Sequence, residues 1–271
     1  MNKTLENRYA GKTIVVTGVT SGNGRALANL LLALGAVVVG IGRNRERLEA
    51  FQRKGGIPYQ LDLGRMVDID QFVNWFRRTY RRCDGLFHLA GTGVIGQVSS
   101  AEFAAFQASD LTGPIRLAEG ILPIMKRCAT VAVVTSGSVA LAQGVPELAQ
   151  YVRVKEGMVK WCARNRGRFQ TRGVNLMLIA MGAIGSEIWT TASGFAKPFG
   201  WLMRRALPRP ERYSELILAD AMRGCPATYP GFLAGLTNFD GEEYRASLPL
   251  ITPAVQFAVR WSLRLGQRGR P

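Results

Sequence analysis

The fold is decided by the stretch TIVVTGVTSGNGRA, which covers residues 13–26. Its first five residues are all β-branched, which predicts a buried strand. Glycines follow at positions 18, 22 and 24, and a helical pattern begins directly after them. A turn of this kind lets the backbone approach a pyrophosphate, whose charge the helix N-terminus favours. The stretch therefore predicts a nucleotide-binding turn, with a glycine-containing loop that binds no ligand as the alternative.

Short apolar strands continue to alternate with longer helical patterns as far as residue 180. Continuous apolar strands suit a parallel sheet that is covered on both faces. The alternation predicts an α/β, doubly wound Rossmann fold with a parallel sheet of six or seven strands and helices on both faces. Strands are expected at residues 13–17, 36–41, 58–61, 85–89, 130–135 and 174–180, and helices at 24–34, 43–53, 68–82, 109–127 and 150–168.

The length and composition fit one such domain. The chain has 271 residues, of which 47% are hydrophobic and 20% are charged, so disorder is excluded for most of its length. The alternation weakens beyond residue 186. We expect a single Rossmann-type domain over 1–271, in which residues 187–212 form a substrate lid and residues 240–271 form a basic C-terminal extension.

The basic residues outnumber the acidic ones by 35 to 19, which gives a net charge of +16. Such an excess suits nucleic acid, an anionic membrane surface or an anionic small molecule. The longest nearly apolar run, residues 26–41, is shorter than the ~20 residues that span a bilayer. The N-terminus also lacks the apolar core of a signal peptide. We therefore expect a cytoplasmic protein without a transmembrane helix.

The thiols and the imidazole are too far apart in the sequence to form a recognised site. The four cysteines show no CxxC spacing, and no cysteine lies near the single histidine, His88. A disulfide framework and a metal site are therefore not expected.

The end of the second predicted strand bears on the choice of cofactor. NAD-selective sites usually place Asp or Glu here to accept hydrogen bonds from the adenosine ribose. This chain has no acidic residue at positions 40–45 and instead has Gly42 followed by Arg43. A guanidinium suits the 2′-phosphate of NADP, so NADP(H) is predicted to be preferred and NAD(H) is the alternative. The other interpretation is that Arg43 and Arg45 are solvated residues at the start of a helix.

Tyr151 and Lys155 are four residues apart, so a helix places them on one face. An ammonium favours a neighbouring phenolate, which helps a tyrosine to act as a general acid or base. Ser138 follows a predicted strand, at the edge where open α/β sheets bind their ligands. We expect Ser138 to donate to a substrate carbonyl oxygen while Tyr151 supplies the proton. A half-exposed surface pair is the alternative for Tyr151 and Lys155.

Together these motifs resemble the short-chain dehydrogenase/reductase family over residues 12 to about 190. The segment MGAIGS, residues 181–186, resembles the PGxxxT segment of that family, with Met for Pro and Ser for Thr. The joint occurrence is far more specific than any single motif. The match rests on the turn TGVTSGNG, on Asp62-Leu63 and Ala90-Gly91 after the third and fourth strands, and on Ser138, Tyr151 and Lys155.

The resemblance implies an oxidoreductase that transfers hydride between a nicotinamide and a carbonyl or alcohol carbon. It assigns Ser138, Tyr151, Lys155 and Asp110 to catalysis, and Ser138, Tyr151, Trp189 and Phe195 to the substrate. It assigns no metal. The residues it places at the cofactor are Gly18, Thr20, Ser21, Gly22, Asn23, Gly24, Arg43, Asp62, Leu63, Ala90, Gly91, Tyr151, Lys155, Gly182, Ile184 and Ser186.

The chain departs from the family pattern near this site. His88-Leu89 stands where the family has Asn-Asn, and Asp110 replaces an asparagine that helps to hold a water linked to the lysine. A carboxylate at 110 would stabilise the ammonium of Lys155 and alter the proton relay. We interpret His88 as a structural histidine at a strand end. The VDGG-type ending of the family is also missing, so a seventh strand is not placed.

The leading prediction is an NADP(H)-dependent carbonyl reductase or alcohol dehydrogenase for a lipophilic ketone or secondary alcohol, because residues 187–212 are rich in aromatic side chains. An epimerase or dehydratase of the same fold and a cofactor-binding regulatory protein without turnover are the alternatives. The resemblance implies a homodimer or homotetramer with contacts on helices 109–127 and 151–168. A basic helix at 255–264 suggests a peripheral membrane contact. No nucleic-acid motif is present, so that partner is not expected.

Overall fold

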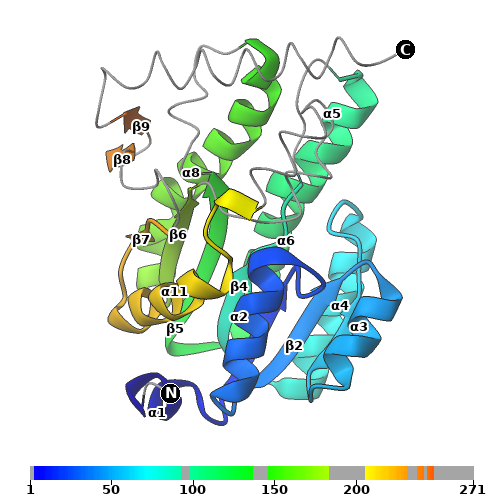
Figure 1. Cartoon of the computed structure of the whole chain (residues 1–271), viewed down its shortest axis with the longest axis vertical. Coiled ribbons are helices and arrows are strands. Elements are labelled where there is room, and N and C mark those ends of the chain that lie inside the picture. The colour runs from blue at the N-terminus through cyan, green and yellow to red at the C-terminus, as the bar shows by residue number, and fades with distance from the viewer. Residues whose placement is uncertain are drawn as a thin grey trace.

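The sheet that the strand pattern predicts is the centre of the computed structural model. The structure describes residues 3–92, 98–136, 146–182, 205–230, 237–240 and 243–246. Within these ranges, seven parallel strands pair in the order β3-β2-β1-β4-β5-β6-β7 (Figure 1). All seven strands point the same way, so their carboxyl ends share one edge of the sheet.

The described elements alternate along the chain as the sequence predicts. The strands are β1 (Thr13–Thr17), β2 (Val37–Gly42), β3 (Ile57–Gln60), β4 (Cys83–His88), β5 (Met125–Ser136), β6 (Asn175–Met181) and β7 (Ala227–Thr228). The helices are α1 (Lys3–Tyr9), α2 (Gly22–Ala33), α3 (Arg45–Gln52), α4 (Met66–Tyr80), α5 (Ser100–Gln107), α6 (Gly113–Ile121), α8 (Ala149–Gln170) and α11 (Glu211–Arg223). A separate antiparallel pair is formed by β8 (Thr237–Asp240) and β9 (Glu243–Ala246).

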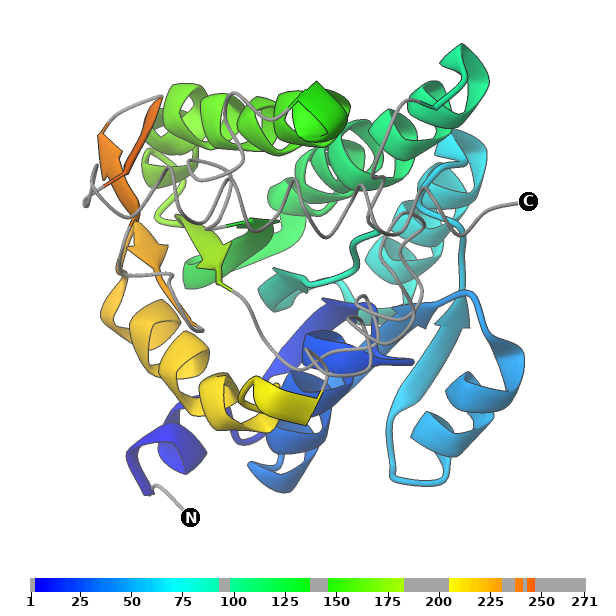
Figure 2. The same cartoon turned by 45° about the horizontal axis from the view of Figure 1, so that its top comes forward.

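Two layers of helices cover the sheet, one on each face (Figure 2). One face packs against α4, α6 and α8, where Phe72, Phe76 and Phe169 are fully buried. The other face packs against α1, α2, α3 and α11, where Leu31 and Leu218 are fully buried. Burial on both faces explains why the strands read as continuous apolar runs rather than as alternating ones.

The helix predicted at 109–127 is wrong at both ends. A capping box starts α5 nine residues earlier, because the Ser99 side chain accepts from the backbone of Glu102 and the Glu102 carboxylate accepts from Ser99. Residues 108–112 then form a turn of π-helix before α6 continues. The helical run stops at Ile124, and residues 125–127 are strand, since Pro123 lacks the amide N–H that a continuing helix needs.

Five of these elements were not predicted: α1, α11, β7, β8 and β9. The strand β7 is only two residues long, but its pairing with β6 fixes the seventh position of the sheet. The predicted substrate lid lies outside the described residues as far as position 204, and α11 begins at its end. The predicted basic helix at 255–264 also lies outside them. Among the helices that the structure describes, none is both long and apolar enough to cross a bilayer.

The start of α6 is pressed against the loop that follows β3. A Cβ added at Gly113 would overlap the carbonyl oxygen of Leu63, so this approach requires glycine. Gly113 directly follows the π-turn that carries Asp110. The contact therefore helps to fix the π-turn at the carboxyl edge of the sheet.

We predict that Gly113→Ala lowers the free energy of unfolding by about 2 kcal/mol or more, because backbone must shift to admit the methyl group. Gly167→Ala in α8 is the matched control, since a Cβ there meets nothing within 4 Å. That variant should raise the free energy of unfolding by about 0.5–1 kcal/mol through helix propensity. Urea denaturation of both variants measures the difference, and equal effects would contradict the packing argument.

Candidate active site

The glycine turn lies between the end of β1 and the start of α2. Gly18 has φ +79°, and a Cβ there would lie 2.9 Å from the Cα of Ala90. Gly22 has φ +50°, and a Cβ at Gly24 would overlap the carbonyl oxygen of Gly18. Each glycine is thus required by backbone conformation or by close approach. The turn leaves the first N–H groups of α2 available for an anion.

A buried polar atom in this turn supports the nucleotide interpretation. The side-chain oxygen of Asn23 is buried and has no hydrogen-bond partner within the described residues. An unsatisfied buried acceptor is costly unless a ligand or water supplies a donor. A ribose hydroxyl is such a donor, so the residues of this turn fit a dinucleotide.

Three arginines near the end of β2 make different contacts. Arg43 is exposed, and its carbonyl oxygen accepts from Gln60 Nε2 at 3.0 Å. Arg45 pairs with Glu49 at 3.2 Å along α3. Arg47, which sequence reasoning missed, donates from Nη1 to the carbonyl oxygen of Thr20 at 3.3 Å. Asn44 is the sequence signal that could have identified Arg47. Its side chain caps the start of α3 by accepting from the backbone N–H of Arg47, so Arg47 lies in the first turn of α3, beside the glycine turn.

Two predicted pairs follow β3 and β4 at the same edge of the sheet. Asp62 accepts from the backbone N–H of Gly64 at 2.9 Å, and Leu63 is buried. Ala90 is half-buried and touches the glycine turn, whereas Gly91 is exposed. The structure therefore brings these residues to the edge of the sheet at which the sequence predicts the cofactor.

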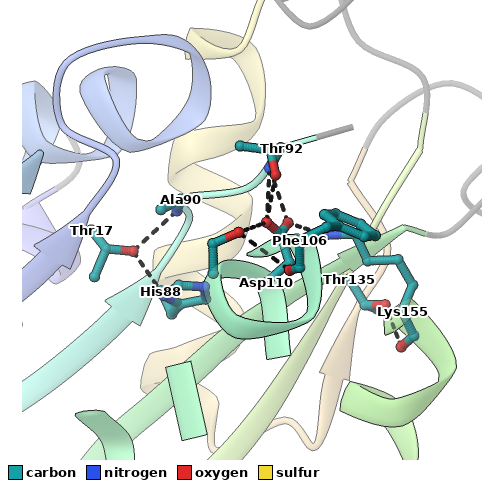
Figure 3. A network of polar contacts seen from close by, with 9 residues as sticks. Thr17, His88, Ala90, Thr92, Phe106, Asp110, Thr135 and Lys155 are labelled. Atoms are coloured by element: carbon teal, nitrogen blue, oxygen red, sulfur yellow. Dashed lines mark hydrogen bonds and ion pairs between the residues drawn. The ribbon is translucent and has the colours of Figure 1, made fainter. Parts of the chain in front are cut away.

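The hydroxyl of Thr17 ties β1 to β4 (Figure 3). It accepts from the backbone N–H groups of Leu89 and Ala90 at 3.2 and 3.0 Å. It also lies 2.9 Å from Nδ1 of His88. Since both backbone groups are donors, the single hydroxyl hydrogen is left for Nδ1, and the ring proton is assigned to Nε2.

His88 is a buried, neutral side chain. Only 1% of it is exposed. Burial lowers the pKa of His88 to about 4, with the opposed charges of Asp110 and Lys155 as smaller influences. These observations agree with the structural interpretation of His88.

Asp110 and Lys155 form an ion pair beneath Gly91. Lys155 Nζ donates to Asp110 Oδ1 at 2.8 Å, and the two side chains are only 6% and 1% exposed. The ammonium lies 5.6 Å from the ring centroid of Tyr151 and 5.8 Å from that of Phe106. These two rings stack with centroids 6.1 Å apart. The ammonium thus has a carboxylate as its ionic partner and two aromatic rings beside it. Figure 3 shows the carboxylate of Asp110 and the ring of Phe106.

Further donors hold the carboxylate of Asp110. Thr92 donates from its backbone N–H to Oδ1 at 2.9 Å and from its hydroxyl to Oδ2 at 2.7 Å. Ser109 donates its hydroxyl to Oδ2 at 2.8 Å. Sequence reasoning missed Thr92 and Ser109, because only the fold brings residue 92 beside the π-turn.

For Asp110 and for Lys155, the charged and hydrogen-bonded partners together affect the pKa more than burial does. Burial acts to raise the pKa of Asp110, but the Lys155 ammonium and the donors of Thr92 lower it below its usual value. Burial acts to lower the pKa of Lys155, but Asp110, with a smaller contribution from Tyr151, raises it. Both groups are therefore charged at neutral pH.

The structure assembles part of the predicted site. Tyr151, Lys155 and Asp110 lie together, with Gly91 directly against the ion pair. Gly182 follows β6 and is half-buried. Five predicted site residues lie outside the described residues: Ser138, Ile184, Ser186, Trp189 and Phe195.

Comparison with known proteins matches the short chain dehydrogenase family model over residues 12–195. The oxidoreductase asL5 of Sarocladium schorii is 25% identical over 193 residues, which are 69% of this chain and 78% of that protein. The 3-oxoacyl-[acyl-carrier-protein] reductase FabG of Escherichia coli K12 is 24% identical over 186 residues, which are 66% of this chain and 76% of that protein.

Solved structures show the same fold. A dehydrogenase/reductase from Sinorhizobium meliloti 1021 superimposes with a TM-score of 0.69 at 18% identity, over 83% of this chain and 96% of the other. BdcA, solved in complex with NADPH, gives a TM-score of 0.67 at 18% identity, over 78% and 87% of the two chains. The doubly wound fold predicted from the sequence is confirmed.

We predict that the buried neutral His88 makes folding sensitive to acid. The unfolded chain takes up a proton on this imidazole near pH 6.5, whereas the folded chain does so only near pH 4. The stabilisation from His88 is therefore present above pH 6.5 and is lost as the pH falls to 4, by about 3 kcal/mol in all.

The comparison variant is His88→Asn, which keeps an acceptor for the Thr17 hydroxyl but cannot be protonated in this range. Its free energy of unfolding, measured by urea denaturation between pH 7 and 4, should fall less steeply than that of the unaltered protein. Parallel curves for the two proteins would show that His88 does not carry this pH dependence.

Proposed function

This chain belongs to the short-chain dehydrogenase family, and from that premise we propose that it is an NADP(H)-dependent carbonyl reductase or alcohol dehydrogenase. Enzymes of this family act on CH–OH groups with NAD(P) as the acceptor. The observation that carries the proposal is the position of Tyr151 beside Lys155 on α8, with Gly91 against the lysine. This arrangement puts a proton donor and a cation next to the edge that bears the glycine turn.

Tyr151 is proposed to exchange the proton. In the reductive direction its hydroxyl donates a proton to the carbonyl oxygen, and in the oxidative direction it takes a proton from the alcohol. The ammonium of Lys155 favours the phenolate that is left after donation. Ser138 is proposed to donate a hydrogen bond to the same oxygen. The bound nicotinamide would supply or accept the hydride.

The proposed cofactor site has three parts. Gly18, Thr20, Ser21, Gly22, Asn23 and Gly24 would hold the pyrophosphate and the adjoining ribose. Asp62, Leu63, Ala90 and Gly91 would border the adenosine, and Gly182, Ile184 and Ser186 the nicotinamide. Arg43 is proposed to meet the 2′-phosphate of NADP(H), since it is exposed at the end of β2 and has no carboxylate partner within the described residues. Arg47 is proposed as a second cation there.

A lipophilic ketone or secondary alcohol is the proposed substrate class. The support is the aromatic composition of residues 187–212, with Trp189 and Phe195 as the proposed contacts. A homodimer or homotetramer is proposed to form through α6 and α8. A peripheral membrane contact through the basic C-terminal extension, residues 240–271, also remains a proposal.

A cofactor-binding protein without turnover is the second candidate. One observation favours it: the ammonium of Lys155 is bonded to Asp110, so its charge is already balanced. Turnover with any carbonyl or alcohol would exclude this candidate.

We predict that Tyr151→Phe lowers kcat for carbonyl reduction by about 100-fold or more, because the proton donor is lost. NADPH binding, followed by its fluorescence, should be retained. The matched control is Tyr80→Phe, which removes a hydroxyl from the aromatic cluster on α4. Full turnover in Tyr151→Phe would disprove the assigned mechanism.

We predict that Arg43→Glu weakens NADPH binding by about tenfold or more and changes NADH binding by less than about threefold, since only NADPH carries the 2′-phosphate. Arg45→Glu makes the same charge change two residues away, at a side chain that is turned toward Glu49. Arg45→Glu should weaken NADPH binding less than Arg43→Glu does. Isothermal titration calorimetry gives all the constants, and equal losses for both cofactors in Arg43→Glu would remove the NADP(H) assignment.

A further inference from the structure

The Asp110–Lys155 pair places an ionised carboxylate inside the site, next to the ammonium. Each of the two side chains is at most 6% exposed, so neither charge is balanced by solvent. The carboxylate is fixed by two donors from Thr92 and one from Ser109 in addition to the ammonium. Asp110 is therefore held in place as a permanent counter-ion of Lys155.

The ionisable surroundings of the Lys155 ammonium can be named element by element. The π-turn contributes Asp110, and α8 contributes Tyr151. The strand β4 contributes His88, which is neutral at physiological pH. On β5, the Thr135 hydroxyl donates to the backbone carbonyl of Lys155, and on α5 the ring of Phe106 lies beside the ammonium. The Thr135 and Phe106 side chains are both uncharged. Among the residues that the structure describes, Asp110 and Tyr151 are thus the two groups that compete to be the anion beside this lysine.

The Lys155 ammonium that a Tyr151 phenolate would need as its partner is already bonded to Asp110. An ammonium favours a nearby phenolate most when it has no other anion. Here Asp110 is bonded to Nζ at 2.8 Å, whereas the Tyr151 ring is centred 5.6 Å away. The bonded carboxylate balances the charge, so the lysine has less capacity to stabilise a phenolate.

We propose that Asp110 is a positioning residue that keeps the hydroxyl of Tyr151 protonated at neutral pH and so favours carbonyl reduction over alcohol oxidation. This inference rests on the proposed function. Reduction consumes one proton, which moves from the Tyr151 hydroxyl to the carbonyl oxygen while hydride adds to the carbonyl carbon. Oxidation releases one proton, which a Tyr151 phenolate must accept. A site that retains the phenol is ready for reduction and needs more alkaline conditions for oxidation.

The first experiment observes the phenolate directly in the cofactor-free protein. Ultraviolet absorbance near 295 nm is recorded against pH for the unaltered chain and for Tyr151→Phe, and the difference isolates residue 151. The proposal expects no phenolate at residue 151 between pH 7 and 8. A phenolate already present at pH 7 would overturn it, and this arm requires no variant of Asp110.

The second experiment removes the negative charge with the isosteric variant Asp110→Asn. The phenolate of residue 151, isolated as the difference from Asp110→Asn/Tyr151→Phe, should then appear about one pH unit lower or more, which is a tenfold change in the ionisation equilibrium. The alkaline rise of kcat for alcohol oxidation should move in the same direction. If the phenolate appears at the same pH with and without the carboxylate, Asp110 does not control the proton.

Thr92→Val is the matched control, because it removes a hydrogen bond to the same carboxylate and leaves the charge in place. It should leave the pH of phenolate formation within about 0.3 units of the unaltered protein. A shift as large as that of Asp110→Asn would indicate a loss of packing rather than of charge and would overturn the proposal. The absorbance arms need neither cofactor nor substrate, so their outcome is independent of whether the assigned activity is found.

Discussion

The hydroxyl of Thr17 joins the carboxyl ends of two neighbouring strands, and the geometry of the cofactor edge depends on that junction. By accepting from Leu89 and Ala90, it draws the backbone after β4 onto the glycine turn. No side chain fits at Gly18 once Ala90 is there. The same segment continues to Thr92, which holds Asp110 and, through it, Lys155. A single hydroxyl on β1 is thus linked by direct contacts to the proposed catalytic lysine on α8.

The site combines this geometry with a balance of buried charge. Carboxylate and ammonium are both withdrawn from water, and each remains ionised because the other is present. The adjacent imidazole is neutral, so the buried charges sum to zero. The net charge of +16 therefore does not come from the interior of the site. Most of the arginines that the structure describes lie on the surface, where pairs such as Arg116–Asp70 are exposed to solvent and contribute little to stability.

Prediction from the sequence succeeded where local patterns carry the information. Short apolar runs placed six strands to within a few residues at most boundaries, and the glycine spacing placed the turn. Prediction failed for the start of β5, which lies five residues before the expected 130, and for both ends of the helix before it. The capping box of Ser99 determines where that helix begins, and the missing N–H of Pro123 determines where it ends and β5 starts. The strand β7 has two residues and no periodicity to detect; only its pairing with β6 defines it.

The sequence by itself determined the order of the elements, the glycine turn and the presence of Tyr151 and Lys155 on one helical face, because these depend on residues close together in the chain. The family resemblance predicted that a carboxylate at 110 would stabilise Lys155, but only the tertiary structure decided that the two side chains bond directly. Asp110 is 45 residues away from Lys155, and Thr92 is 18 residues away from Asp110. Their meeting depends on the π-turn, on the close approach at Gly113 and on the shared edge of a parallel sheet. Long-range packing of this kind leaves no local pattern, since burial and pairing of charge arise only when distant segments come together.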